Sequence, residues 1–458
     1  MRLLFTALAC LISVNIFSQT IPTNSNYNEG VVWENVFTEG PSGKVNRGIV
    51  DSQGNCIVVF MPDNKTRIHK IHGETGDLIW SITINNKVGF GISELVENDQ
   101  SDYIISGGSG NSQERWIARI NGDNGDIIWD KTYNYNGGNG EYDGVRMTCI
   151  GSDGFIYGSG FVNGDESDTV FVVYAGDAMI IKVDPNNGNE VWTHINNETE
   201  YALACVESSD NYIYYGGVEY EEGLSITKLS FNGVESWTNF IENTEGVIPY
   251  DLDIDNDDRL FYGGHTSREG AGDPFDYTCV KINIEGNLVW IKHFANPRGY
   301  SSEHIRNELY GIQVGSDGVY LFGGSGDESN YSSTNPPFPS SDVWVGWVLA
   351  IDFDGEIIRS DVFCHEDVNS ATEYGYLIEN GYVIFNDTDA GGDTEVGVMK
   401  IINGSNPNIN NNIYEPSQSD KKLEKVVDAL GREVNQSNNQ IILYIYNDGS
   451  VEKKFVVE

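Results

Sequence analysis

The sequence predicts an all-β fold made of seven repeated units, and three observations support that prediction. A hydrophobic run, a glycine-containing turn and a tryptophan recur together along the chain, for example at 71–80 and 120–129. The spacing of this phrase ranges from 45 residues (Trp192 to Trp237) to 69 residues (Trp290 to Arg359), the size of one supersecondary unit. Between the phrases, short β-branched and aromatic runs alternate with Gly and Asx turns. Together these features predict the blades of a seven-bladed β-propeller.

Residues 143–196 show how one blade is built. Strands are expected at 143–150, 155–161, 178–183 and 190–195, because each is a β-branched or aromatic run bounded by turn residues. In six of the blades a glycine lies four residues before the Trp or its substitute Arg359: Gly76, Gly125, Gly188, Gly233, Gly286 and Gly355. The third strand carries a cation before its last apolar residue in all but one blade, where Ala350 stands instead. We expect these cations to form salt bridges between blades or to lay their apolar stems along the surface.

Glycines also mark the second strand, which ends in Gly107-Gly108, Gly216-Gly217, Gly263-Gly264 and Gly323-Gly324. Such pairs permit close packing near the axis of the ring. The last hydrophobic run, 398–402, has no tryptophan after it, whereas Trp33 stands alone near the start of the chain. Residues 31–37 are therefore expected to supply the outer strand of the blade whose first three strands come from 371–402. This pairing closes the ring without an open seam.

The phrase ending in Thr75-Gly76, three residues and Trp80 resembles the tryptophan-docking repeats of quinoprotein-type propellers. The other copies keep Gly and Trp but lose Thr. The resemblance covers most of 31–402 and implies that the turn joins the third and fourth strands, with the Trp packed between neighbouring blades. Active quinone enzymes of this type carry adjacent cysteines over the cofactor. No two cysteines are adjacent here, so no quinone cofactor is expected.

The ends of the chain differ from its middle. Residues 1–19 read as a secretory signal, with Arg2 before an apolar run that is too short for a stable membrane span, and a lipoprotein signal ending at Cys10 is the alternative. The propeller is expected over 20–402 and an Asn-rich linker over 403–420. The five cysteines after the signal are odd in number and scattered, which favours buried thiols over a disulfide framework.

Residues 421–458 read as alternating strands around an Asn-Asp-Gly turn and predict a small β-sandwich. Their Leu-Gly-Arg-Glu segment and terminal Tyr-x-Asp-Gly-x-Val-x-Lys-Lys pattern resemble the C-terminal sorting domain (type A) of Bacteroidetes type IX secretion substrates. The usual Tyr-Pro-Asn-Pro opening is replaced by Tyr414-Glu-Pro-Ser. The resemblance implies the type IX secretion machinery as a partner, removal of the tail, and release or attachment at the outer-membrane surface.

The formal net charge of −42 argues against binding to nucleic acid or to anionic membranes, because a polyanionic surface repels both. The acidic run 251–258 looks like a calcium loop, but it aligns with an inner strand entering its hairpin turn and lacks the Gly and Glu of an EF-hand loop. No metal site is therefore expected, although bound calcium remains an alternative that would relieve the charge.

The long inserts fall between second and third strands (163–177, 265–276, 325–342) and between blades (134–142, 295–308). All these connections emerge on one face of the ring, where functional loops would cluster. Aromatic and arginine side chains in and beside them suit sugars and carboxylates. The expected ligand-binding residues are Arg268, Arg298, Tyr331, Trp344 and Trp347. The candidate catalytic residues are His265, Tyr300, His304 and Arg306.

These residues lead to three alternatives. The first is an exported binding module for a glycan or a cell-surface partner. The second is a polysaccharide lyase, in which Arg neutralises a uronate carboxylate while His or Tyr transfers protons. The third is a purely structural surface protein whose loops are merely solvated.

Overall fold

A computed structural model shows the protein as two compact units, 1–404 and 405–458, each of which is described by itself. The structure describes residues 26–37, 44–62, 65–97, 100–109, 114–135, 142–164, 166–168, 172–174, 176–219, 222–266, 275–294, 305–327, 344–365, 370–389, 395–402, 423–428, 440–446 and 451–456. In this part of the chain, no helix has the length and apolarity needed to cross a membrane.

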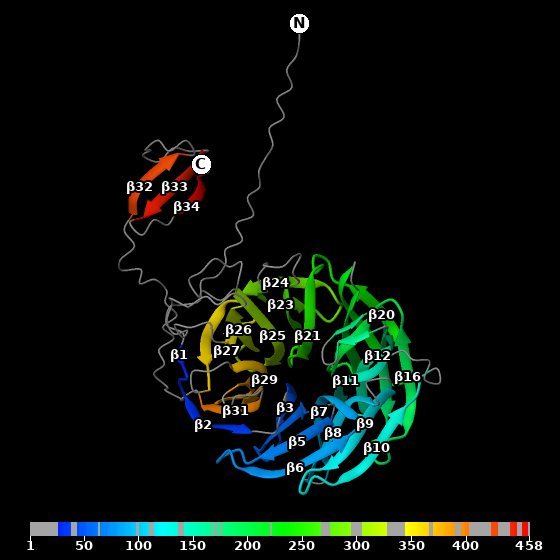
Figure 1. Ribbon diagram of the computed structural model, residues 1–458. Helices are drawn as coiled ribbons and strands as arrows, with labels where there is room; N and C mark the ends of the chain where they lie inside the picture. Colours follow the sequence, from blue (N-terminus) through cyan, green and yellow to red (C-terminus); the bar gives the residue numbers. More distant parts are fainter. Residues whose placement is uncertain are drawn as a thin grey trace. The chain divides into compact units, whose positions relative to one another are not determined.

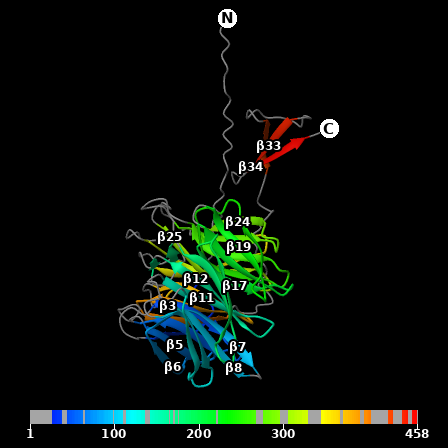
Figure 2. The same ribbon diagram turned by 90° about the vertical axis from the view of Figure 1, so that its right-hand side faces the viewer.

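The first unit is a ring of seven four-stranded antiparallel sheets, which confirms the predicted seven-bladed propeller (Figure 1). Figure 2 shows the blades around β17 and β19 from the side. Blade 1 consists of β3 (Lys44–Val50), β4 (Cys56–Met61), β5 (Lys65–Ile71) and β6 (Leu78–Asn85). Blade 2 consists of β7 (Lys87–Glu97), β8 (Gln100–Ser109), β9 (Glu114–Asn121) and β10 (Ile127–Tyr133). Blade 3 consists of β11 (Tyr142–Ile150), β12 (Ile156–Gly164), β15 (Asp177–Val183) and β16 (Glu190–Asn196).

The remaining blades follow the same order from the inner to the outer strand. Blade 4 consists of β17 (Tyr201–Glu207), β18 (Tyr212–Glu219), β19 (Gly223–Ser230) and β20 (Glu235–Phe240). Blade 5 consists of β21 (Val247–Ile254), β22 (Leu260–Thr266), β23 (Tyr277–Ile282) and β24 (Leu288–Phe294). Blade 6 consists of β25 (Ile305–Val314), β26 (Val319–Asp327), β27 (Val345–Ile351) and β28 (Ile357–Phe363). Blade 7 consists of β29 (Ser370–Ile378), β30 (Gly381–Thr388), β31 (Glu395–Ile402) and the N-terminal β2 (Val31–Phe37). A short hairpin, β13 (Glu166–Asp168) and β14 (Val172–Tyr174), lies in the second-to-third connection of blade 3.

The N-terminal strand closes the ring as the sequence predicts. β2 pairs antiparallel with β31, and Trp33 lies opposite Lys400 in this pairing. The Ile402 N–H donates to the Gly30 carbonyl at 2.9 Å. β1 (Asn26–Tyr27) adds a short parallel pairing to the outer strand β28 of blade 6. The two ends of the first unit are therefore held together by backbone hydrogen bonds.

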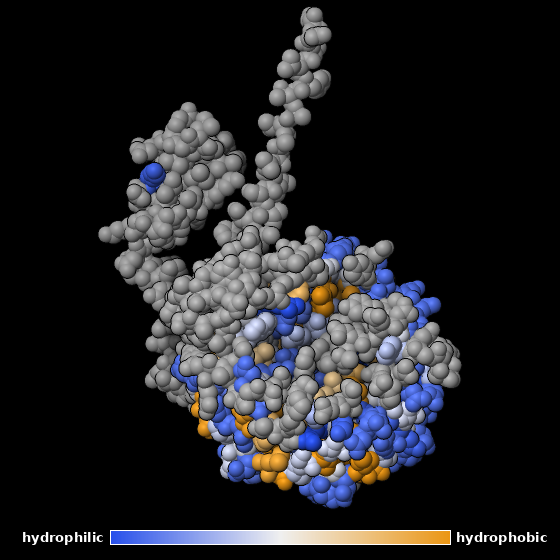
Figure 3. Space-filling view, viewed as in Figure 1, coloured by the Kyte–Doolittle hydropathy of each residue, from blue (hydrophilic) through white to orange (hydrophobic). Residues whose placement is uncertain are grey.

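Burial follows the layers of the ring. The middle strands are buried on both faces because neighbouring blades pack face to face, as in β27, where all seven residues are buried. The outer strands alternate, and some apolar residues on them are about half exposed, such as Ile79 and Ile128. In Figure 3 orange apolar residues accordingly reach the rim among blue hydrophilic ones.

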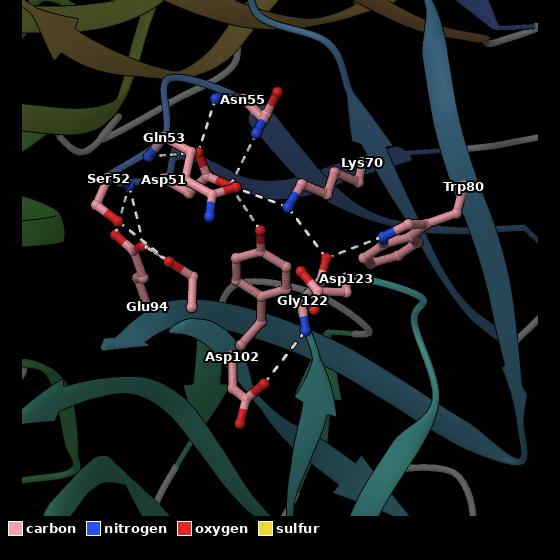
Figure 4. A network of polar contacts seen from close by, with 12 residues as sticks. Asp51, Ser52, Gln53, Asn55, Lys70, Trp80, Glu94, Asp102, Gly122 and Asp123 are labelled. Carbon is pink, nitrogen blue, oxygen red and sulfur yellow. Dashed lines mark hydrogen bonds and ion pairs between the residues drawn. The ribbon is translucent and has the colours of Figure 1, made fainter. Parts of the chain in front are cut away.

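Neighbouring blades are joined by a repeated tryptophan contact, which Figure 4 shows between blades 1 and 2. The Trp80 Nε1–H donates to the Gly122 carbonyl at 3.1 Å, and the Lys70 Nζ donates to the same oxygen at 3.0 Å. Lys70 also pairs with Asp51 at 3.2 Å, and Asp51 in turn accepts the Tyr103 hydroxyl at 2.7 Å. Both lone pairs of one turn carbonyl are thus used by the preceding blade.

Two donors on one carbonyl recur at other interfaces, with distances between 2.7 and 3.2 Å. In each case a Trp Nε1–H and a cation donate to the same backbone carbonyl: Trp33 and Lys400 to that of Gly73, Trp129 and Arg119 to that of Pro185, Trp192 and Lys182 to that of Phe231, and Trp290 and Lys281 to that of Phe353. The recurring cation of the third strand therefore binds a backbone carbonyl of the next blade, in addition to carboxylates. The salt bridges expected between blades form only in part. One example joins Lys400 of blade 7 to Glu74 of blade 1 at 3.0 Å.

The turn glycines complete this contact. Each adopts a positive φ, and an added Cβ would collide with the preceding blade: at Gly76 it would lie 2.8 Å from Trp33, and at Gly188 it would lie 2.6 Å from Trp129. At Gly76 and Gly188 a side chain would meet both backbone strain and the indole ring, whereas at Gly355 the nearest atoms belong to Lys292. The Gly–Trp spacing in the sequence thus reflects contact between successive blades, not within one.

Blade 6 departs from the pattern, with Arg359 and Ala350 in place of the Trp and the cation. Their carbonyl acceptor would belong to the turn between the third and fourth strands of blade 7. Those strands, β31 and β2, come from opposite ends of the unit, so no such turn joins them. Arg359 forms an ion pair with Asp361 in its own blade.

The described part of the second unit is one antiparallel sheet of three strands: β32 (Leu423–Asp428), β33 (Gln440–Tyr446) and β34 (Val451–Val456).

Candidate functional site

Each of the seven inner strands carries a β-bulge at the same place. At this place one residue of every inner strand lacks a partner in the pairing with the second strand: Asn46, Phe90, Arg146, Leu203, Tyr250, Tyr310 and Glu373. The second-strand glycines lie opposite these bulges, and a Cβ at Gly107 would lie 1.8 Å from the Val88 carbonyl oxygen. The predicted close packing of these glycines is confirmed at this site. A bulge changes the direction of the side chains around it, here those at the axis of the ring.

A pocket lies in the central channel at the level of the bulges. Residues from the inner strands of blades 1, 2, 3, 5 and 7 line it: Asn46, Arg47, Phe90, Arg146, Met147, Tyr250 and Tyr374. Its volume outside the atoms is about 270 Å³, open solvent included, but the space that a water centre can occupy suits about one water molecule. The pocket therefore fits a small polar group and not a whole sugar ring.

One of the two arginines in the pocket is neutralised by a carboxylate. The Arg47 Nη2 lies 3.0 Å from the Asp251 Oδ2, which joins blade 1 to blade 5 across the channel. Asp251 also accepts the Ile312 N–H at 3.1 Å, and the Arg47 guanidinium lies 4.7 Å from the centre of the Tyr374 ring. Burial by itself lowers the pKa of Arg47, but the Asp251 carboxylate outweighs it, so this pKa lies above its ordinary value.

The other arginine has no such partner. Arg146 is only 6 % exposed, and its guanidinium lies 5.6 Å from the centre of the Tyr201 ring. Among the described residues it has no ion pair, and its guanidinium donates no hydrogen bond to a side chain. A guanidinium at the wall of a pocket is chemically able to pair with an anionic group.

The acidic run of the fifth inner strand serves the structure. Asp251 and Asp253 lie on β21, and Asp255 accepts backbone N–H groups of the following hairpin turn, as the sequence predicts. Burial raises the pKa of Asp253 to about 7, although the Val314 N–H at 2.8 Å opposes this shift. Among the residues that the structure describes, no group of three or more His, Cys, Asp or Glu side chains is placed to hold a metal ion.

Two of the candidate catalytic residues, His265 on β22 and Arg306 on β25, lie close to each other. The His265 ring stacks on Phe275 with 4.6 Å between centroids, and the Arg306 guanidinium lies 4.6 Å from the centre of the same ring. His265 is 2 % exposed and Arg306 pairs with Glu308 at 2.9 Å. His265 is therefore part of an aromatic cluster beneath the long-loop face. Five further candidates lie outside the described residues: Arg268, Arg298, Tyr300, His304 and Tyr331.

The two tryptophans proposed as ligand-binding residues differ in their surroundings. Trp347 is fully buried, stacks on Tyr277 with 4.4 Å between ring centroids, and donates its Nε1–H to Ser360 at 3.1 Å. The assignment of Trp347 to ligand binding is therefore wrong, because its ring fills the core of blade 6. Trp344 is half-buried and covers Gly326 of β26, where an added Cβ would lie 2.0 Å from the indole.

The sequence prediction missed the pocket residues because it looked for function in the inserts. The one feature of the local sequence that could have indicated these residues is a charged residue within an apolar inner strand, such as Arg146 between Val145 and Met147. That sign does not reveal which strands meet at the axis.

Comparisons with known proteins show the fold and no more. No protein-family model matches the chain, and no curated protein matches it either. The solved hydrazine synthase of Kuenenia stuttgartiensis is similar, with a TM-score of 0.52 and 10 % identity over 78 % of this chain and 96 % of that one. The Neurospora crassa Pan2 WD40 domain gives a TM-score of 0.46, 12 % identity and coverage of 79 % and 91 %. Quinohemoprotein alcohol dehydrogenase from Comamonas testosteroni gives 0.40, 10 % identity and coverage of 76 % and 65 %.

Proposed function

We propose that the propeller is an exported or cell-surface binding module that takes the carboxylate of an acidic ligand, such as a uronic-acid glycan, into the pocket of its central channel. The observation that supports this proposal is Arg146, a buried cation on the pocket wall with no ion pair among the described residues. A buried charge without a counter-ion is costly, and a bound carboxylate would remove that cost. A charge-assisted hydrogen bond of this kind contributes about 1.5–3 kcal/mol.

The pocket also restricts what can bind. It admits one carboxylate and not a sugar ring, so the rest of the ligand would lie outside it, towards the face of the long inserts. The loop residues predicted from the sequence, such as Arg298 and Tyr331, would meet the ligand there. The net charge of −42 repels a polyanion at long range, but salt screens this repulsion over about 8–10 Å. Binding is therefore expected to tighten, not weaken, as moderate salt is added.

Titration calorimetry of the full chain with trigalacturonate tests this proposal, and the methyl ester of the same sugar is the uncharged comparison. Arg146→Met is expected to weaken trigalacturonate binding at least about 10-fold and to leave binding of the ester unchanged. Arg259→Met is the matched control, because Arg259 pairs with Asp255 at a hairpin turn on the opposite face. Equal affinity of the wild type and Arg146→Met for trigalacturonate would rule out the pocket as the site. No saturable binding of either sugar by the wild type would leave the structural-protein alternative.

A lyase remains the second proposal, supported by the proximity of His265 and Arg306 at Phe275. The same samples test it, since β-elimination creates an unsaturated uronate that absorbs in the ultraviolet. Rising absorbance that is lost in Arg306→Ala would favour the lyase over the binding module. Binding without a rise in absorbance would favour the binding module.

For the tail we propose a type IX sorting domain with a small β-sandwich, of which β32, β33 and β34 form one sheet. The secretory signal over 1–19 and the linker over 403–420 belong to the same proposal. Deleting 421–458 should leave the protein in the periplasm of a type IX-competent host, and cell fractionation measures this. Secretion of the deleted form into the medium would contradict the sorting role.

A further inference from the structure

Two cysteines from neighbouring blades face each other beside the channel. Cys149 lies on β11, the inner strand of blade 3, and Cys205 lies on β17, the inner strand of blade 4. Their sulfur atoms are 3.0 Å apart. The two strands belong to different sheets, so no backbone ladder joins them. The contact between the two sulfurs thus crosses a blade interface.

The surroundings hold both side chains in place. Cys205 is 6 % exposed and its sulfur lies 3.5 Å from the Tyr157 carbonyl oxygen, while Cys149 is half-buried. Cys205 belongs to the apolar cluster between blades 3 and 4, which includes Tyr157 and Ile213, and Cys149 packs against this cluster. A disulfide has an S–S length of about 2.05 Å, so bonding needs a movement of roughly 1 Å.

We propose that Cys149 and Cys205 form a disulfide that ties the inner strands of blades 3 and 4 together. Each thiol gives up a proton, the S–S bond forms, and the two electrons reduce an external disulfide oxidant to two thiols. Thiol–disulfide exchange through a mixed disulfide is the route. The export expected from the N-terminal signal would bring the chain to a compartment where such oxidants act. The inference is independent of the proposed ligand.

The timing of the reaction follows from the same contact. The hydrogen bond to Cys205 and burial hold the pKa of Cys149 well above its ordinary value, so little thiolate exists in the folded protein at neutral pH. Because the thiolate is the attacking species, the folded reduced protein should oxidise slowly. The bond is therefore expected to form while the blades assemble. Once formed, it would fix the wall of the pocket, because Arg146 lies on the same strand as Cys149.

Peptide mapping of the full chain tests the proposal. The protein is unfolded and refolded with oxidised and reduced glutathione, then unfolded again and alkylated with or without prior reduction. We expect the peptides of Cys149 and Cys205 to be linked in the unreduced sample and to be alkylated only after reduction. The fully buried Cys56 and Cys279 serve as internal controls, which should be alkylated in both samples. Recovery of both Cys149 and Cys205 as alkylated thiols without reduction would overturn the proposal.

A second measurement separates a covalent tie from mere packing. Reductant should lower the melting temperature of the refolded wild type by several degrees, and it should leave that of the double variant Cys149→Ser/Cys205→Ser unchanged. Equal loss in both proteins would contradict the proposal. If the serine variants do not fold, the peptide map of the wild type still decides the question.

Discussion

The docking of each tryptophan against the next blade can be measured with one pair of glycine substitutions in blade 3. Gly188 lies in the turn that receives Trp129, with φ of 69°, and an added Cβ would lie 2.6 Å from Trp129 and 2.7 Å from Lys131. Gly154 lies in another turn of the same blade, with φ of 80°, and an added Cβ there would meet nothing within 4 Å. Gly188→Ala and Gly154→Ala therefore share the backbone strain and differ in the contact with Trp129.

The expected magnitude follows from these contacts. Alanine with a positive φ costs about 1–2 kcal/mol, and the reduced freedom of the unfolded chain offsets about 0.4–1 kcal/mol. Gly154→Ala should thus destabilise the propeller by about 1 kcal/mol. At Gly188 the displaced indole adds about 1–3 kcal/mol of overpacking, and weakening of the 2.8 Å hydrogen bond from Trp129 to the Pro185 carbonyl adds about 1 kcal/mol. Gly188→Ala should therefore cost about 2–4 kcal/mol more than Gly154→Ala.

Urea unfolding followed by tryptophan fluorescence is the assay. All nine tryptophans lie between residues 33 and 347, so the signal reports the propeller and not the tail. Effects on the unfolded chain are the same for both variants and cancel in the difference between their midpoints. A difference below about 0.5 kcal/mol would refute the docking argument, because that is the usual range of substitutions without a specific contact.

Three further predictions use the same measurement of stability. Arg47→Met should lower the free energy of unfolding by about 3–5 kcal/mol, because it leaves the buried Asp251 without its counter-charge. The double variant Arg47→Met/Asp251→Asn should recover part of that loss. Equal losses in the single and the double variant would contradict a coupled pair. His69 is buried between Phe37 and Phe60 and its pKa is lowered to about 4 by burial, so the unfolded chain binds a proton that the folded chain excludes as the pH falls from 6.5 to 4. Wild type should therefore lose about 3 kcal/mol more than His69→Leu over this window, and parallel pH profiles would refute it. Reducing a Cys149–Cys205 bond, which closes a loop of 56 residues, should cost about 4 kcal/mol in the chain-entropy model, and an unchanged urea midpoint after reduction would speak against the bond.

Much of the ring could be predicted because its determinants are local and repeated. The Gly–Trp phrase specifies a turn and an outer strand within ten residues. Its six copies, one of them with Arg359 in place of Trp, and the hydrophobic run 398–402 together give the number of blades. The closure of the ring could be predicted from two incomplete repeats. Trp33 has no hydrophobic run and turn before it, and the hydrophobic run 398–402 has no Trp after it, so the two are assigned to one blade. The sequence does not explain why Arg359 and Ala350 replace the Trp and the cation in blade 6. The structure does, because blade 7 has no turn between its third and fourth strands whose carbonyl could accept their hydrogen bonds.

The pocket and the cysteine pair could not be predicted because they depend on closure of the ring. Arg47 and Asp251 are 204 residues apart and meet only across the channel. Cys149 and Cys205 lie 56 residues apart in the sequence, yet they occupy inner strands that become neighbours. Trp347 fails for a related reason, because an aromatic beside a long insert has the same local sequence pattern whether it faces solvent or the core.

All seven inner strands have a bulge at the same place, but the residue at the bulge differs from blade to blade. At the outer interface five of the blades place a Trp and a cation on a carbonyl of the next blade, so these positions hold nearly constant residues. At the bulge they hold Asn46, Phe90, Arg146, Leu203, Tyr250, Tyr310 and Glu373, which share neither size nor charge. If the bulges served only the fold, equivalent positions would be expected to converge on similar side chains, as the docking positions do. The divergence within one chain is therefore best accounted for by the channel itself, and it agrees with the proposed recognition of a carboxylate there, which rests on the buried Arg146 at the pocket wall.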